Sequence, residues 1–121
     1  NIENIEEDYF PNSNLIKHYK TSHIYINLSR VESFGITFIE SLASGVPIIS
    51  FDTKGVNELI QDDVNGFLIK KFELGNFINK IDEIYNNKKL LNSLSIGAKN
   101  SVNNYDLSKN TKDLLNLYNS V

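Results

Sequence analysis

Hydrophobic positions divide the first 70 residues into short apolar runs separated by amphipathic segments. Three runs have the length and the β-branched content of buried strands: Ile24–Leu28, Val46–Phe51 and Gly66–Ile69. A fourth candidate strand is Ile2–Ile5. Strands that alternate with helices favour parallel α/β layering. We therefore predict a parallel sheet of three to four strands.

In the segments between these strands, apolar residues recur at the spacing of an α-helix. One helix is predicted over Ser13–Tyr19, with the Ser13 side chain as its N-cap. A second is predicted over Ile36–Ser44, where Gly45 would end it, as glycine commonly does just after a helix. Val56–Ile60 predicts a short helical turn ahead of the third strand.

After residue 70 the pattern is helical only. Apolar residues recur at helical spacing over Leu74–Ile84 and again over Leu91–Val102. Asp106 opens a last predicted helix, which carries Tyr118 on its apolar face. We expect this helical tail to pack back on the sheet.

Length and composition describe one globular unit. The chain has 121 residues, which suits a single domain over residues 1–121. Hydrophobic residues make up 40% of the chain and charged residues 22%, which excludes a disordered or collagen-like protein. Because the chain contains no methionine, residue 1 is not a translation start, and we expect a fragment of a longer protein. The small number of strands agrees with that expectation.

Charge and cysteine content narrow the classes of partner. The net charge of −3, with no basic patch, argues against nucleic acid as the main ligand. The chain has no cysteine, which excludes disulfide bonds and zinc–thiolate sites and agrees with a cytoplasmic location. No apolar run is long enough to cross a bilayer.

The stretch Ser29–Ile49 carries the candidate chemistry. A strand ends before it, a loop follows, and a helix begins after Gly35. In open α/β sheets, ligands bind at the carboxyl ends of the strands, where such a loop lies. The backbone N–H groups of Phe34, Gly35, Ile36 and Thr37 would face that edge. Free amides and the helix dipole together form an anion site that suits a phosphate.

Two glutamates flank this predicted helix start. Glu32 lies in the loop and Glu40 about one turn inside the helix, so both can point to the same edge. Ionised carboxylates only accept hydrogen bonds, and the vicinal hydroxyls of a ribose or a hexose are matching donors. The alternative is that both are solvated surface residues, the usual place of glutamate. Arg30 could reach a phosphate or pair with a surface carboxylate.

The pair Glu32-x7-Glu40 stands in S-R-x-E-S-F-G-x-x-x-x-E-S-x-A-S-G-x-P-I-I. This pattern resembles the donor-binding motif of retaining GT-B glycosyltransferases of the family-4 type, the glycosyl transferases group 1. Downstream, Gly55–Ile60 and Asn65–Ile69 resemble the family's next loop, helix and N-G-F-L strand. The resemblance implies the C-terminal half of a GT-B enzyme: a partial Rossmann-like three-layer sandwich, with helices on both faces of the parallel sheet and a helical C-terminal tail.

The resemblance also assigns this stretch to the three parts of a nucleotide sugar. The transferred sugar would contact Glu32, Phe34 and Gly35, the diphosphate would contact the amides of Ile36 and Thr37, and the ribose would contact Glu40. It implies no metal ion and no other cofactor, because basic side chains and helix amides carry the leaving-group charge. No residue is assigned as a catalytic nucleophile.

The function implied is transfer of a hexosyl group from a UDP- or GDP-sugar to an acceptor. The acceptor would be held by an N-terminal domain that these 121 residues do not include, and the parent protein could also contact a membrane peripherally. The basic residues of an earlier loop are likewise missing, so we expect the fragment alone to be inactive. The alternative is a non-catalytic, glycosyltransferase-like binding or scaffold module that stabilises a partner. Retention of both Glu32 and Glu40 favours the enzyme.

Overall fold

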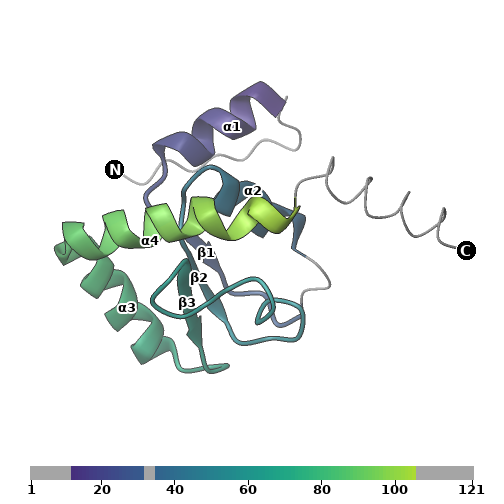
Figure 1. Cartoon of the computed structure of the whole chain (residues 1–121). Coiled ribbons are helices and arrows are strands. Elements are labelled where there is room, and N and C mark those ends of the chain that lie inside the picture. Colours follow the sequence, from purple (N-terminus) through teal and green to yellow (C-terminus); the bar gives the residue numbers. More distant parts are fainter. Residues whose placement is uncertain (1–11, 32–34, 106–121) are drawn as a thin grey trace, which may run out of the picture.

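The computed structural model describes residues 12–31 and 35–105. It contains a three-stranded parallel sheet with the strand order β1-β2-β3, as the sequence predicted (Figure 1). The elements follow in the order α1 (Asn12–Thr21), β1 (Tyr25–Asn27), α2 (Ile36–Ala43), β2 (Ile48–Phe51), β3 (Gly66–Ile69), α3 (Leu74–Asn86), α4 (Lys88–Ser101) and the 3-10 helix η1 (Val102–Tyr105).

Helices cover both faces of the sheet because alternate residues of β2 enter two separate cores. Ile48 packs in one core with Phe38 of α2. Ile49 and Phe51 pack in the other core with Phe77 of α3. Helix α4 contributes a fully buried residue to each core, and Figure 1 shows it crossing the molecule between α2 and α3. The predicted three-layer α/β architecture is confirmed.

The strand register places the carboxyl ends of β1 and β2 side by side. Tyr25 pairs with Ile48, and Asn27 pairs with Ser50. The buried Asn27 Nδ2 donates a hydrogen bond to Ser50 Oγ at 3.2 Å. Since the strands are parallel, the loops that follow them open at one edge of the sheet, the carboxyl edge, and helix α2 begins there.

Three predicted boundaries differ from the structure. The first strand was predicted over Ile24–Leu28 but comprises Tyr25–Asn27. The second strand was predicted from Val46 but begins at Ile48, because the Val46 N–H donates to the Ser41 carbonyl of α2 at 3.0 Å and Pro47 has no N–H. The prediction of Ser13 as an N-cap was wrong, because α1 already includes Asn12. The other predicted helices up to residue 101 are confirmed, with ends that differ by at most three residues.

The predicted helical turn over Val56–Ile60 is confirmed as a single turn, in which Ile60 N donates to the Val56 carbonyl at 3.1 Å. Val56 N donates to the Thr53 carbonyl at 3.1 Å. The buried Asn65 closes this segment through its side chain, which donates to the Leu59 carbonyl at 2.9 Å and accepts from the Gln61 backbone amide at 2.7 Å. One buried amide therefore holds the loop between β2 and β3.

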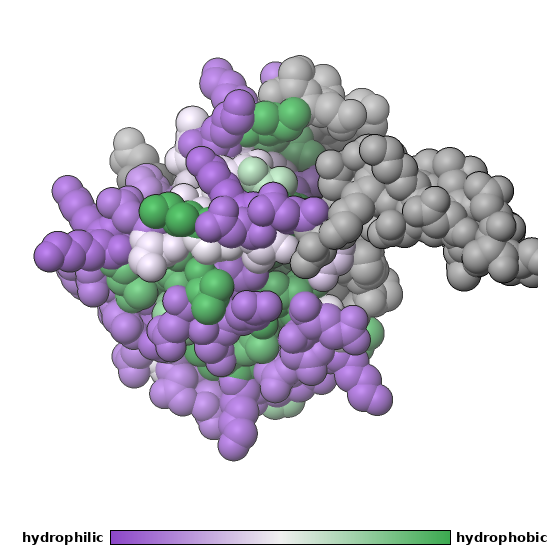
Figure 2. All heavy atoms as spheres, viewed as in Figure 1, coloured by the Kyte–Doolittle hydropathy of each residue, from purple (hydrophilic) through white to green (hydrophobic). Residues whose placement is uncertain are grey.

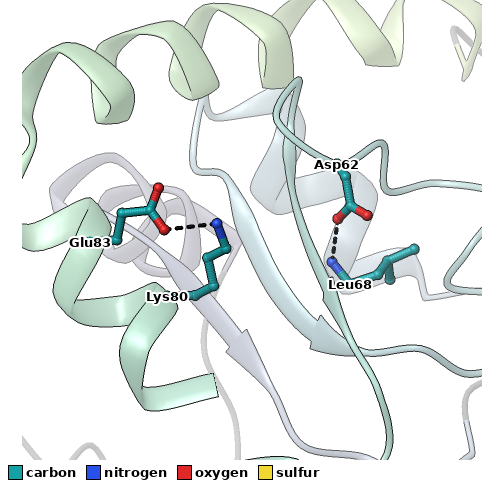
Figure 3. Close-up of polar contacts among 4 residues, drawn as sticks. All are labelled: Asp62, Leu68, Lys80 and Glu83. Carbon is teal, nitrogen blue, oxygen red and sulfur yellow. Dashed lines mark hydrogen bonds and ion pairs between the residues drawn. The ribbon is translucent and has the colours of Figure 1, made fainter. Parts of the chain in front are cut away.

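Polar contacts fix the outer strand and α3 (Figure 3). Asp62 Oδ1 accepts a hydrogen bond from the Leu68 backbone N at 2.7 Å, beside the start of β3. Lys80 of α3 pairs with Glu83 at 2.7 Å, and its Nζ lies 4.1 Å from the centre of the Phe67 ring. Lys80 thus connects α3 to β3 through the cation–π contact, whereas its ion pair lies within α3.

The view in Figure 2 shows a mostly hydrophilic face with smaller hydrophobic patches below α4. None of the helices in residues 12–31 and 35–105 is long and apolar enough to span a bilayer. The fourth candidate strand, Ile2–Ile5, and the last predicted helix, from Asp106, lie outside the described residues.

Candidate functional site at the start of helix α2

Gly35 forms the turn from which α2 begins. Its φ of 65° and ψ of 57° are left-handed, and its carbonyl accepts hydrogen bonds from Phe38 N at 2.9 Å and Ile39 N at 3.3 Å. A β-carbon at this position would overlap the Phe38 ring. Both the backbone angles and the close packing therefore require glycine. The prediction that Gly35 stands at the start of a helix is confirmed.

The first amides of α2 lie at the carboxyl edge of the sheet. Ile36 and Thr37 occupy the first turn, where backbone N–H groups have no acceptor within the helix. Both residues are exposed, with 68% of Ile36 accessible to solvent. Amides at a helix start also carry the positive end of the helix dipole. This arrangement can bind an anion such as a phosphate.

Glu40 lies one turn further along α2 and is partly buried. Its Oε2 accepts a hydrogen bond from the Tyr19 hydroxyl at 3.2 Å. The same hydroxyl lies 3.4 Å from the backbone carbonyl oxygen of Thr37. Burial of Tyr19, followed by the charge and the hydrogen bond of Glu40, raises the pKa of this hydroxyl well above its ordinary value. The hydroxyl therefore stays protonated and acts as a donor.

A cleft of about 480 Å³ separates α1 from α2, and Glu40 is among the residues that line it. This volume lies within the range usual for small-molecule sites. The cleft is lined by Leu15, Ile16, Tyr19, Lys20, Glu40, Ala43 and Ser44. One wall is therefore largely apolar, and Glu40 places a carboxylate in the other.

A second tyrosine supports the first turn of α2. The Tyr25 hydroxyl donates to Thr37 Oγ1 at 3.2 Å. Its ring meets Phe38 edge-on, with ring centres 5.6 Å apart. The sequence reasoning missed both tyrosines as site residues. The signal was slight: Tyr19 stands on the apolar side of the predicted first helix, and Tyr25 begins a predicted strand.

The structure brings together four of the six residues predicted for the donor site. Gly35, Ile36, Thr37 and Glu40 share the start of α2. Glu32 and Phe34 lie outside the described residues, so their place beside Glu40 stays a prediction.

Other groups lie at the same edge of the sheet. The Arg30 guanidinium, which follows β1, lies 5.7 Å from the centre of the Phe72 ring. Thr53, which follows β2, is buried, and its Oγ1 has no hydrogen-bond partner among the described residues. In the part of the chain that the structure describes, no group of three or more histidine or acidic residues could hold a metal ion.

The family model for glycosyl transferases group 1 matches residues 8–101. The chain belongs to this family. A Staphylococcus aureus poly(ribitol-phosphate) alpha-N-acetylglucosaminyltransferase is 30% identical over 99 residues, which are 80% of this chain and 20% of that protein. This member of the group 1 family therefore spans about a fifth of the length of that curated relative.

Solved structures agree with this assignment. A variant of S. aureus TarM, solved with fondaparinux, alpha-GlcNAc-glycerol and UDP, superposes with a TM-score of 0.78 at 27% identity, covering 86% of this chain and 22% of that one. The C-terminal domain of a group 1 glycosyl transferase from Francisella tularensis gives a TM-score of 0.72 at 23% identity. This superposition covers 88% of this chain and 53% of that one. The fold of this group 1 chain is that of a GT-B C-terminal domain, as predicted.

Proposed function

We propose that this chain is the nucleotide-sugar donor-binding part of a retaining glycosyltransferase that takes a UDP- or GDP-linked hexose. The observation that carries the proposal is the start of α2, where a left-handed Gly35 presents helix amides one turn before the Glu40 carboxylate. Amides match a diphosphate, and a carboxylate matches vicinal hydroxyls. Membership of the glycosyl transferases group 1 supports this interpretation.

Each part of the donor has a proposed contact. The diphosphate binds the amides of Ile36 and Thr37, the ribose hydroxyls bind Glu40, and the transferred sugar binds Glu32, Phe34 and Gly35. UDP accompanies the TarM variant in its solved structure, which favours a uridine nucleotide as the first probe. Because helix amides are fixed in direction before the reaction, they can stabilise the negative charge that develops on the departing diphosphate.

The complete transfer reaction is proposed for a longer protein. The chain spans about a fifth of the S. aureus transferase, and the acceptor site is assigned to an N-terminal domain outside these 121 residues. The proposal includes no metal ion and no enzymatic nucleophile. A cytoplasmic location and a peripheral membrane contact of the parent protein stay predictions from the sequence.

Calorimetric titration of UDP and of GDP into the chain tests the donor-binding proposal. The expected result is saturable binding of one nucleoside diphosphate, with weaker binding of the corresponding monophosphate because the amides of α2 lose a phosphate. If neither diphosphate binds at millimolar concentration, the donor-site proposal fails, and the alternative of a non-catalytic scaffold module is favoured.

A further inference from the structure

The contact between Tyr19 and Glu40 joins two helices across the α1–α2 cleft. The two residues are 21 positions apart, and Tyr19 is only 8% exposed. Among the described residues, the Tyr19 hydroxyl is the hydrogen-bond partner of the Glu40 carboxylate, and the bond is made to Oε2. One carboxylate oxygen is therefore held by the protein.

The Tyr19 hydroxyl is itself fixed in place. It lies 3.4 Å from the Thr37 carbonyl oxygen, at the first turn of α2, as well as 3.2 Å from Glu40. The Tyr19 ring also packs against Tyr25, with ring centres 6.4 Å apart. A buried ring that packs on a second ring has little rotational freedom, so the surroundings of the Tyr19 ring set the position of its hydroxyl.

A glutamate without such a partner samples many side-chain rotamers, and binding a ligand must then order it at an entropic cost. A carboxylate that receives hydrogen bonds from two neighbouring hydroxyls has to present its oxygens in one direction. Both residues line the cleft, Tyr19 from α1 and Glu40 from α2. The Tyr19 hydroxyl is therefore placed to hold the Glu40 carboxylate in one orientation.

We infer that Tyr19 is a positioning residue for Glu40: its hydroxyl holds Oε2 and leaves Glu40 ordered to accept hydrogen bonds from a pair of vicinal ligand hydroxyls. Identification of those hydroxyls with the ribose of a nucleotide rests on the proposed function. The ordering of Glu40 by Tyr19 does not depend on any ligand.

A measurement without ligand tests the ordering directly. Tyr19→Phe removes the hydroxyl and keeps the ring, and Tyr25→Phe is the matched control, because its hydroxyl bonds Thr37 Oγ1 rather than Glu40. Three-bond NMR couplings in the full 121-residue chain report the χ1 angle of Glu40. We expect one rotamer in the unmodified chain and in Tyr25→Phe, and averaged couplings in Tyr19→Phe. A single, unchanged Glu40 rotamer in Tyr19→Phe would overturn the inference.

A second measurement shows whether the ordering matters for hydroxyl recognition. The probes are UDP and 2′,3′-dideoxy-UDP. The ratio of their affinities measures what the ribose hydroxyls contribute to binding. Tyr19→Phe should lower this ratio by roughly two- to 150-fold, the range for coupled residues in one hydrogen-bond network, with little change for the dideoxy compound. Any effect of Tyr25→Phe through Thr37 acts on both nucleotides alike, so this variant should keep the ratio. In Glu40→Ala the further change Tyr19→Phe should have no effect on the ratio.

The outcomes separate the inference from the proposed function. If the unmodified chain does not distinguish the two nucleotides, the ribose assignment of Glu40 fails, and the rotamer measurement still decides the role of Tyr19. If the chain distinguishes them and Tyr19→Phe distinguishes them equally well, the hydroxyl of Tyr19 has no positioning role, whatever its effect on stability.

Discussion

The backbone of Gly97 in α4 lies directly against the carbonyl oxygen of Val64. A β-carbon at residue 97 would overlap that oxygen. Because Val64 belongs to the loop between β2 and β3, this contact packs α4 against the loop that leads into β3. Gly75, by contrast, stands in the first turn of α3 with nothing within 4 Å of the place where a β-carbon would be.

This pair of glycines predicts opposite effects of the same substitution. Gly97→Ala should lower the free energy of unfolding by about 1–3 kcal/mol, because backbone rather than a flexible side chain must move. Gly75→Ala should raise it by about 0.4–1 kcal/mol, because alanine restricts the unfolded chain without a clash. Urea unfolding followed by circular dichroism measures both. Equal effects of the two substitutions would contradict the close approach at Gly97.

The buried Asn65 predicts a second loss of stability. Asn65→Ala leaves the Leu59 carbonyl and the amide of residue 61 without their partner. An unsatisfied buried group costs about 1–3 kcal/mol, and because Leu59 is buried whereas Gln61 is exposed, the free energy of unfolding should fall by about that amount. Asn79→Ala, on the exposed face of α3, is the control and should change it little. A loss no greater than that of the control would mean that water replaces the side chain.

Tyr19 predicts a pH dependence of stability. Burial, with the charge of Glu40, raises the pKa of its hydroxyl above the ordinary 10, so the folded chain holds this proton longer than the unfolded chain does. The contribution of the protonated Tyr19 hydroxyl to the free energy of unfolding is therefore complete below about pH 10. It is lost as the pH rises above about 10, at up to about 1.4 kcal/mol per pH unit. Unfolding free energies between pH 8 and 11 should fall more steeply for the unmodified chain than for Tyr19→Phe. Parallel pH profiles would refute this prediction.

The sequence predicted the arrangement of the fold well because its signals are local. The run Gly66–Ile69 coincides with β3, and Gly45 follows α2, with a φ of 77°. Strand ends were less predictable, because they depend on pairing rather than on hydrophobicity. In β1 only Tyr25–Asn27 pairs with β2, although the apolar run is longer.

In the candidate site, too, local features could be predicted from the sequence and features that depend on packing could not. Gly35 and the start of α2 follow from a glycine placed before a helical pattern, which the sequence displays directly. The contact of Tyr19 with Glu40 could not be predicted, because it depends on how α1 packs on α2 across the intervening strand. Spacing along the chain carries no information about that packing angle.

Glu40 predicts a selective effect on nucleotide binding. A hydrogen bond to a charged group is worth about 1.5–3 kcal/mol, so Glu40→Ala should weaken UDP or GDP binding by about tenfold or more. Glu83→Ala removes a surface carboxylate of α3 and should leave the affinity unchanged. Isothermal calorimetry compares the two. Unchanged affinity in Glu40→Ala would show the ribose assignment to be wrong.

Glu32→Ala should act differently from Glu40→Ala in a protein that includes the acceptor domain. If Glu32 contacts the transferred sugar, its loss should lower turnover more than it weakens binding of the free nucleoside diphosphate. Steady-state kinetics together with calorimetry measure both quantities. An equal loss of nucleotide affinity in the two variants would mean that both glutamates support the loop rather than contact separate parts of the donor.

The 121-residue chain alone should not transfer sugar. The proposed acceptor site and the basic residues that would neutralise the diphosphate lie outside it. Incubation with common UDP- and GDP-sugars and a panel of acceptors should give no product above a control without protein. Robust turnover would contradict the assignment of the acceptor to another domain.

We propose that the start of α2 binds the diphosphate and ribose of a nucleotide. Titration of UDP into the isotope-labelled chain, followed through backbone amide shifts, tests it most directly. We expect saturable shifts that are largest at Gly35, Ile36, Thr37 and Glu40. Shifts confined to a distant surface, such as the groove beside Tyr85 between α3 and α4, or no saturable shifts with either UDP or GDP, would contradict it.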